Sequence, residues 1–274
     1  MIWIAALSVL IGVIGNIAYK NTRQVQINTI KVDTTKNMET MPPLNILHLS
    51  DLHLENISIT PMELYNKLKT QNYDLIALTG DFLDRKWTIP KLVPYLEVLR
   101  DLNPRHGIFA VFGNHDYVLR KKNFNKLKET LQQYECITMQ NEHVTLEMNG
   151  HIINVIGIDD YSTKRSDLEA SFTGIKEGYN LVLTHDPNIV LEMGDFHFDY
   201  LLSGHFHGGQ ILYPKAYHLV KMGKLPRMNM VKGFHRHEGR PFYISEGLGQ
   251  TGVNIRIGSR PEITLHHLES SSGN

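Results

Sequence analysis

The sequence predicts a layered α/β fold, and three features of the chain indicate it. Short apolar runs end in polar clusters, helix-like stretches lie between several of them, and a 42% apolar content over 274 residues allows a full core. Strands are expected at residues 44–50, 74–79, 108–112, 152–158, 181–184 and 200–203, and then at 241–245 and 262–267. Helices are expected at residues 61–70, 91–102, 123–133 and 188–193. Pro61 and Pro90 stand where helices commonly begin.

The chain begins with an apolar run: residues 2–19 are mostly apolar and contain no charged side chain. A helix over this run would span about 27 Å, enough for the hydrocarbon core of a bilayer, so we expect a transmembrane anchor over residues 1–20. A cleaved signal peptide and a buried core helix are the alternatives. A signal peptide is disfavoured because no Lys or Arg precedes the run and residues 16–18 make a poor cleavage site.

The segment after this run is polar and basic. Residues 21–43 are expected to form a tether that becomes the first strand, residues 44–269 the main domain and residues 270–274 a frayed tail. The charged residues that flank the anchor are Lys20, Arg23, Lys31 and Lys36, against Asp33. By the positive-inside rule, this excess of basic residues predicts a single-pass protein of the cell membrane with its domain on the cytoplasmic side.

Composition excludes several classes of function. Lys plus Arg and Asp plus Glu both number 28, and a balanced chain of this kind argues against nucleic-acid binding. Cys136 is the only cysteine, which excludes an intrachain disulfide and a thiolate metal cluster. The unusual count is histidine, at 15 residues. The positions of the histidines in the sequence should explain this high number.

Polar residues collect at the carboxyl ends of five predicted strands. The clusters are Asp51-Leu52-His53, Gly80-Asp81-Phe82-Leu83-Asp84, Gly113-Asn114-His115-Asp116, Thr184-His185-Asp186 and Gly204-His205-Phe206-His207-Gly208. In open α/β sheets, ligands bind beyond the carboxyl ends of the strands, so we expect these clusters to converge on one site. Imidazole together with carboxylate or amide oxygen, and without sulfur, suits Mn, Fe or Zn rather than Ca.

Taken together, the clusters resemble the motif blocks of the calcineurin-like metallophosphoesterase superfamily. The blocks D-x-H, G-D-x-x-D, G-N-H-D, an isolated histidine and G-H-x-H occur in the family's order, and the resemblance covers residues 44 to about 267. It implies a four-layer α/β/β/α sandwich, two divalent metal ions and hydrolysis of phosphoesters. The continuations at 208–211 and 245–249 resemble a bacterial, membrane-associated branch of the superfamily.

The resemblance also implies a role for each motif residue. The first metal ion would bind Asp51, His53, Asp81 and His207, and the second would bind Asp81, Asn114, His185 and His205. Asp81 would bridge the ions, and a hydroxide between them would attack phosphorus. His115 would assist the leaving group, and Asp116 would fix the tautomer of His115. Asp84 is expected to be structural or to support a ligand.

The substrate and the alternatives stay open at this point. The substrate is expected to be a phosphodiester or a lipid-linked pyrophosphate. The alternative function is a catalytically silent, membrane-tethered module that keeps its metal ions for structure. The complete ligand set and the intact His115 argue against that alternative.

Two further signals lie outside the motif blocks. The run Gly247 to Gly252 matches G-x-G-x-x-G, but no helical pattern follows it, so we interpret it as a loop rather than a dinucleotide site. Residues 211–240 carry seven Lys or Arg with Glu238 as the only acid, and apolar residues are interleaved. This segment is either a solvated surface loop or a flap that contacts anionic lipid headgroups or a phosphorylated amphiphile.

Overall fold

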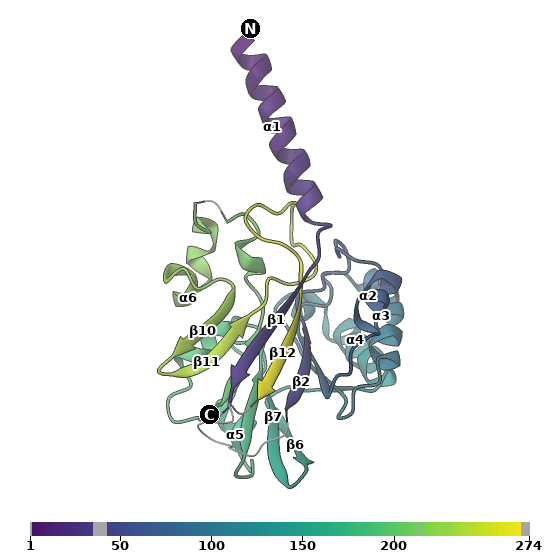
Figure 1. Ribbon diagram of the computed structural model, residues 1–274, viewed down its shortest axis with the longest axis vertical. Coiled ribbons are helices and arrows are strands. Elements are labelled where there is room, and N and C mark those ends of the chain that lie inside the picture. Colours follow the sequence, from purple (N-terminus) through teal and green to yellow (C-terminus); the bar gives the residue numbers. More distant parts are fainter. Residues whose placement is uncertain (1, 35–42, 213, 270–274) are drawn as a thin grey trace.

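The computed structural model describes residues 2–34, 43–212 and 214–269, and two six-stranded sheets form its centre (Figure 1). The first sheet has the order β1-β12-β2-β3-β4-β5. Its strands are β1 (Gln26–Asp33), β12 (Glu262–Glu269), β2 (Leu44–Leu49), β3 (Leu75–Thr79), β4 (Ile108–Val111) and β5 (Cys136–Thr138). Strands β2 to β5 are parallel, and β12 runs antiparallel to β2. The predicted tail at 270–274 lies outside the described residues.

The second sheet has the order β10-β11-β9-β8-β7-β6. Its strands are β10 (Gly233–His237), β11 (Arg240–Ile244), β9 (Tyr200–Ser203), β8 (Tyr179–Leu183), β7 (His151–Gly157) and β6 (Glu142–Met148). The four central strands are parallel, while β6 and β10 pair antiparallel at the edges. The predicted mixed α/β fold is therefore present, and all eight expected strands appear.

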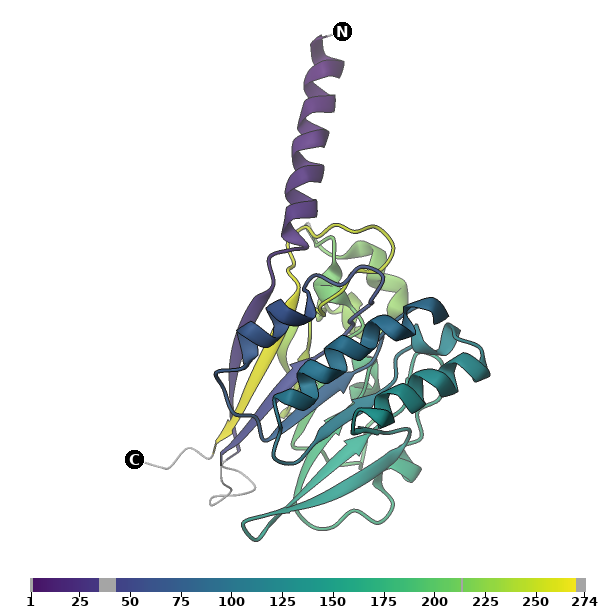
Figure 2. The same cartoon turned by 90° about the vertical axis from the view of Figure 1, so that its right-hand side faces the viewer.

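Helices cover the outer face of each sheet. Helices α2 (Pro61–Leu68), α3 (Ile89–Asp101) and α4 (Lys121–Gln133) lie on the first sheet (Figure 2). The second sheet is covered by α5 (Leu168–Phe172), α6 (Lys224–Arg227) and the 3₁₀ segments η3 (Pro187–Leu191) and η5 (Tyr217–Met222). Shorter 3₁₀ turns are η1 (Lys86–Thr88), η2 (Asp116–Val118) and η4 (His207–Gly209). The helix expected at 188–193 is thus a 3₁₀ segment, one that begins at Pro187 after the Asp186 cap.

The alternation of side chains along the strands builds three hydrophobic clusters between the four layers. On β3, Ile76 and Leu78 pack with the helices, whereas Leu75 and Ala77 face the second sheet. On β8, Leu181 points into the cluster between the sheets, and Val182 packs on the opposite face. Successive side chains of a strand point to opposite faces, so strands that are apolar throughout fit a sheet covered on both sides.

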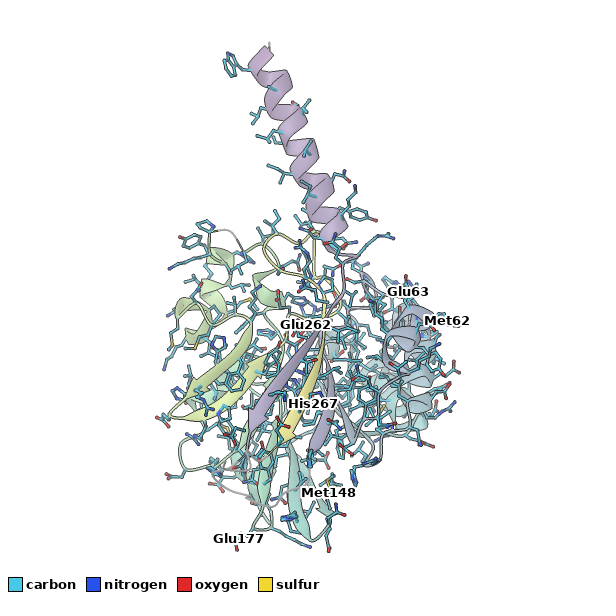
Figure 3. The ribbon with its side chains drawn as sticks, viewed as in Figure 1. Met62, Glu63, Met148, Glu177, Glu262 and His267 are labelled. Atoms are coloured by element: carbon cyan, nitrogen blue, oxygen red, sulfur yellow. The ribbon has the colours of Figure 1, made fainter. Side chains whose placement is uncertain are left out.

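Local signals in the sequence fix individual elements. Thr60 caps α2, and Glu63, labelled in Figure 3, closes the capping box because its carboxylate accepts from the Thr60 backbone N–H. Strand β1 lies within the segment expected as a tether and pairs in parallel with β12 along its whole length. Strand β12, which carries the labelled Glu262 and His267, therefore joins β1 to β2.

Helix α1 (Ile2–Asn21) coincides with the segment for which a transmembrane anchor is predicted. It extends away from the sheets (Figure 3). Its Trp3 and Ile4 side chains are exposed. Within the described residues, however, no helix is long and apolar enough to cross a membrane, so the predicted anchor is not supported. The last turn of α1 instead contacts the domain, where Ala18 is buried and its carbonyl accepts from the backbone N–H of Arg256.

The cluster between the sheets provides a test of this architecture. Replacing the fully buried Leu181 by Ala should lower the free energy of unfolding by about 2–5 kcal/mol, because the lost methyl groups leave a cavity. Val253→Ala is the control, since Val253 is 67% exposed. Thermal unfolding of both variants measures the effect. Equal melting temperatures would contradict the assignment of Leu181 to the core.

Candidate metal centre

The predicted site residues meet where strands from both sheets end. Asp51 and His53 follow β2, Asp81 follows β3, Asn114 and His115 follow β4, His185 follows β8, and His205 and His207 follow β9. The two sheets face each other across their shared core, so their parallel strands deliver these loops to one edge. The expected convergence of the five clusters is what the structure shows.

Five of these residues have a left-handed backbone conformation. Their φ angles are 49° for Asp51, 35° for His53, 53° for Asp81, 76° for His205 and 51° for His207. Residues other than glycine rarely adopt positive φ, and each instance costs on the order of 1–3 kcal/mol. Such conformations persist only where the surrounding structure holds them, and they concentrate at functional sites.

Two glycines of the motif blocks allow backbone to approach the carboxylates. A Cβ atom on Gly204 would overlap with Ser50 Oγ and Asp51 Oδ2, and one on Gly113 would overlap with Asp81 Oδ1. Glycine is therefore required at these two positions because a larger residue would not fit, not because the backbone needs to be flexible. They explain why Gly precedes His205 and Asn114 in the sequence.

One group of potential ligands consists of Asp51, His53 and His207, which offer atoms within 4.8 Å of one another. His207 Nε2 lies 3.3 Å from Asp51 Oδ1. The Nδ1–H of His207 donates to the carbonyl of Gly249 at 3.2 Å, so its Nε2 lone pair is free to bind a cation. His53 is arranged similarly, because its Nδ1–H donates to Asp84 Oδ1 at 3.0 Å.

The second group consists of Asp81, His185 and His205. His185 Nε2 lies 3.2 Å from Asp81 Oδ2 and 3.0 Å from His205 Nδ1. The Nδ1–H of His185 donates to the carbonyl of Thr79 at 2.8 Å, which again leaves Nε2 as the inward atom. Two ring nitrogens that face each other at this distance need a proton or a cation between them.

Three buried ligand atoms show that the residues fit divalent cations. His53 Nε2, Asp81 Oδ2 and Asn114 Oδ1 are buried and have no hydrogen-bond partner. Asp81 Oδ2 lies 3.2 Å from His185 Nε2 and 3.5 Å from His53 Nε2, so it stands between the two groups. Leaving such atoms unpaired costs about 1–3 kcal/mol each, a cost that cation binding would remove.

The charges around Asp81 set the protonation states of the site. Burial alone would raise the pKa of Asp81, but His185 and His53 hold it far below its usual value. Burial lowers the pKa of His207 to about 3 despite the nearby Asp51. An ionised Asp81 and a neutral His207 are the forms in which these side chains bind cations.

His115 lies beside the ligands with its side chain 29% exposed. Its Nδ1–H donates to Asp84 Oδ1 at 3.1 Å, and its backbone N–H donates to Asp81 Oδ1 at 2.8 Å. Burial would lower the pKa of His115, but the Asp84 hydrogen bond and the Asp81 charge raise it to about 9. His115 can therefore hold a proton on the Nε2 atom, which is not used by Asp84.

The structure corrects the predicted role of Asp116. Its carboxylate does not contact His115 but accepts from the backbone N–H groups of Asp81, Phe82 and Gly113, each at 2.9 Å. The side chain is fully buried, and it ties the loop after β3 to the loop after β4. The partner of His115 is Asp84, which was expected to be structural or to support a ligand.

Sequence reasoning missed Arg256. Its buried guanidinium donates to the carbonyls of Gly249 at 2.8 Å, Gly247 at 3.0 Å and His207 at 3.3 Å. The Gly249 carbonyl also accepts the hydrogen bond from His207 Nδ1–H. Arg256 therefore holds in place the carbonyl that orients the ring of His207. No signal in the sequence marks this arginine, because it stands alone in the run Val253 to Ile257.

Comparisons of the chain with known proteins give a matching family model, similar sequences and similar solved structures. The family model for calcineurin-like phosphoesterases matches residues 44–209. The uncharacterized metallophosphoesterase YkoQ of Bacillus subtilis (strain 168) is 62% identical over 251 residues, which cover 92% of this chain and 93% of YkoQ. The UDP-2,3-diacylglucosamine pyrophosphatase LpxG of Chlamydia muridarum is 25% identical, covering 81% of this chain and 82% of LpxG. The crystal structure of TT1561 of Thermus thermophilus is 11% identical with a TM-score of 0.47, covering 76% and 91% of the two chains.

The position of Arg256 leads to a measurable expectation. Arg256→Met should lower the free energy of unfolding by roughly 2–4 kcal/mol, because several charged hydrogen bonds are lost. It should also weaken metal binding, since the Gly249 carbonyl no longer has a fixed position. Arg100→Met on α3 is the control, because that side chain is 45% exposed. Unfolding curves and elemental analysis after metal dialysis measure both effects, and unchanged metal affinity would contradict the link to His207.

Proposed function

The chain belongs to the calcineurin-like phosphoesterase family, and from this we propose that it hydrolyses phosphoesters at a centre of two divalent cations. The observation that carries the proposal is the position of Asp81 Oδ2. It is buried, lacks a hydrogen-bond partner and stands between the two groups of potential ligands. A carboxylate in that position suits the bridge between two cations, because an anion between them offsets their repulsion.

The ligand assignment follows from the two groups. One cation site is made by Asp51, His53 and His207, the other by Asp81, His185, His205 and Asn114, with Asp81 shared. Mn, Fe and Zn suit this mixture of imidazole and oxygen donors. When bound, such cations supply Lewis acidity toward the phosphate oxygens and activate water for attack.

The residues of the chain carry out the remaining tasks. Asp84 holds the His115 ring through Nδ1, so that a proton on Nε2 is available to the leaving oxygen. Asp116 fixes the backbone of Asp81 and thereby the direction of its carboxylate. The partial exposure of His115 suits a group that meets the substrate from the solvent side.

The substrate is proposed to be a phosphodiester or a lipid-linked pyrophosphate. A relative named as a UDP-2,3-diacylglucosamine pyrophosphatase supports the second choice. A place at the cytoplasmic side of the cell membrane stays a prediction, as does membership of a membrane-associated branch of the family.

Two substitutions test the division of labour between Asp81 and His115. Asp81→Asn should weaken binding of both cations, because an amide is a poor bridge. His115→Asn should retain both cations and lose kcat by about 10²–10⁴-fold, the usual contribution of a general acid. Elemental analysis after reconstitution with Mn²⁺ and hydrolysis of bis-p-nitrophenyl phosphate are the measurements.

The results separate the proposal from its alternative. Two retained metal equivalents in Asp81→Asn would contradict the bridge. A wild-type protein that binds metal but hydrolyses neither phosphodiesters nor pyrophosphates would indicate the silent metal-binding module instead.

A double-mutant cycle tests whether Asp84 acts through His115. Asp84→Asn should lower kcat at saturating metal by about 10-fold, the effect typical of a residue that orients another. In the His115→Asn background, the same change should lower kcat little further, because the residue it orients is gone. Equal losses in both backgrounds would show that Asp84 acts through His53 alone.

A further inference from the structure

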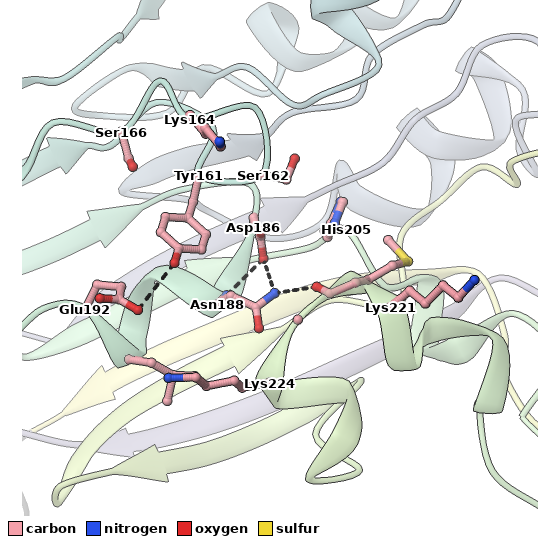
Figure 4. Close-up of a pocket in the computed structure, with 13 residues that line it drawn as sticks. Tyr161, Ser162, Lys164, Ser166, Asp186, Asn188, Glu192, His205, Lys221 and Lys224 are labelled. Atoms are coloured by element: carbon pink, nitrogen blue, oxygen red, sulfur yellow. Dashed lines mark hydrogen bonds between the residues drawn. The ribbon is translucent and has the colours of Figure 1, made fainter.

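A pocket of about 690 Å³ adjoins the metal centre. His205, a member of the second ligand group, forms part of its wall. The rest of the wall comes from the loop at 161–166, from residues 186–192 and from the turn at 221–224 (Figure 4). A phosphoester bound at the cations would therefore have one of its substituents at or inside this pocket.

The pocket wall carries three lysines. Figure 4 shows Lys164 above Asn188, Lys221 to its right and Lys224 to its lower left, so the three lysines lie around the pocket. The ion pairs formed by Lys and Arg in the described part of the chain include none of these three lysines. The lysines outnumber Asp186 and Glu192, the two acidic residues of the same wall, so the wall carries a net positive charge.

The two acidic residues of the wall are already engaged. Asp186 Oδ1 accepts from the backbone N–H of Asn188 at 2.9 Å and from its side-chain Nδ2 at 2.7 Å. Glu192 Oε1 accepts from the hydroxyl of Tyr161 at 3.3 Å. Neutral donors therefore hold both carboxylates in place, and within the described residues neither carboxylate forms an ion pair with a lysine of the wall.

The lysine-bearing turn has a fixed position relative to the metal ligands. The buried Asn188 donates to the carbonyl of Met222 at 2.8 Å and accepts from the backbone N–H of Leu225 at 3.2 Å. Asn188 thus binds both ends of the turn between Lys221 and Lys224. It is itself held by Asp186, the residue after the ligand His185. Gly223 packs so closely on Asn188 that a Cβ atom would overlap with its amide.

We propose that this pocket binds a second anionic group of the substrate, so that the chain prefers pyrophosphate diesters to phosphodiesters with no further charge. The inference rests on the proposed phosphoesterase function and specifies its substrate class. In the reaction, water forms a bond to one phosphorus while the bridging P–O bond breaks. The bridging oxygen leaves with a proton on the second phosphate, so both products are phosphate monoesters and no other reactant is needed.

The test uses two probe substrates that differ by one phosphate. Diadenosine 5′,5′-diphosphate gives two molecules of AMP, and diadenosine 5′,5′-monophosphate gives AMP and adenosine, which chromatography separates. The ratio of kcat/KM for the diphosphate to that for the monophosphate reports binding of the second phosphate. In Lys221→Gln/Lys224→Gln this ratio should fall about tenfold, as expected for two ion pairs at a partly exposed site. Lys91→Gln on α3 is the matched control and should keep the wild-type ratio.

A binding measurement provides a readout without turnover. The diadenosine diphosphate analogue with a methylene bridge cannot be cleaved at the bridge, so calorimetry on the Mn²⁺-loaded protein gives its affinity directly. The double variant should bind it about tenfold more weakly than the Lys91→Gln control. The difference should shrink at high salt, because exposed ion pairs are screened.

The outcomes distinguish this inference from the function on which it rests. If the wild type hydrolyses the monophosphate and bis-p-nitrophenyl phosphate but the double variant keeps the wild-type ratio and affinity, the pocket inference is overturned and the phosphoesterase function stands. If the wild type loaded with metal hydrolyses none of these compounds, both are overturned. A fall in ratio and affinity confined to the lysine variant supports the inference.

Discussion

The site depends on keeping the carboxylate of Asp81 buried and ionised at one fixed position. Removing a charge from water is costly unless opposite charges and hydrogen bonds compensate for it. Here His185 and His53 approach one oxygen, and the backbone N–H of His115 donates to the other. The Asp116 carboxylate accepts a hydrogen bond from the backbone N–H of Asp81 and so fixes its position. The motif residues around Asp81 therefore form one interdependent unit, in which each contact helps to offset the burial of the same charge.

This unit exists only because two sheets end at the same edge. The first sheet supplies Asp51, His53, Asp81 and Asn114, and the second supplies His185, His205 and His207. The cluster between the sheets fixes their relative position, and apolar residues on alternate faces of the strands fix that cluster. Five ligands have positive φ, a strained backbone conformation. The packed sheets hold the loops in this conformation.

Support for the site extends into regions that carry no motif. Arg256 links the loop beneath His207 to the end of α1, because its guanidinium binds Gly249 while its backbone N–H donates to Ala18. Asn188 links the loop after His185 to the basic turn that borders the pocket. Both residues contact backbone groups far away in sequence, those of His207 and Ala18 for Arg256, and those of Met222 and Leu225 for Asn188. The loops that carry His185 and support His207 are therefore connected to the turn at 221–224 and to the end of α1.

The sequence by itself predicted eight of the twelve strands in the described residues, the three helices on the first sheet and the clusters that meet at one edge. Strands β5, β6 and β10 were not expected. Apolar runs with polar ends predict buried parallel strands, and spaced Asp, Asn and His predict cation ligands at their ends. Tertiary structure alone decided that Asp84 rather than Asp116 contacts His115, because the two carboxylates are close in sequence to different ligands and only the loop paths select the partner. It also decided the role of Arg256, whose hydrogen-bonded carbonyls come from the loop after β9 and from residues 247–260. A sequence pattern records which side chains alternate or repeat, whereas contacts between distant loops depend on how the sheets pack. The motif blocks account for five of the 15 histidines, and these can be recognised in the sequence. How their rings are arranged around Asp81 depends on the packing of the two sheets.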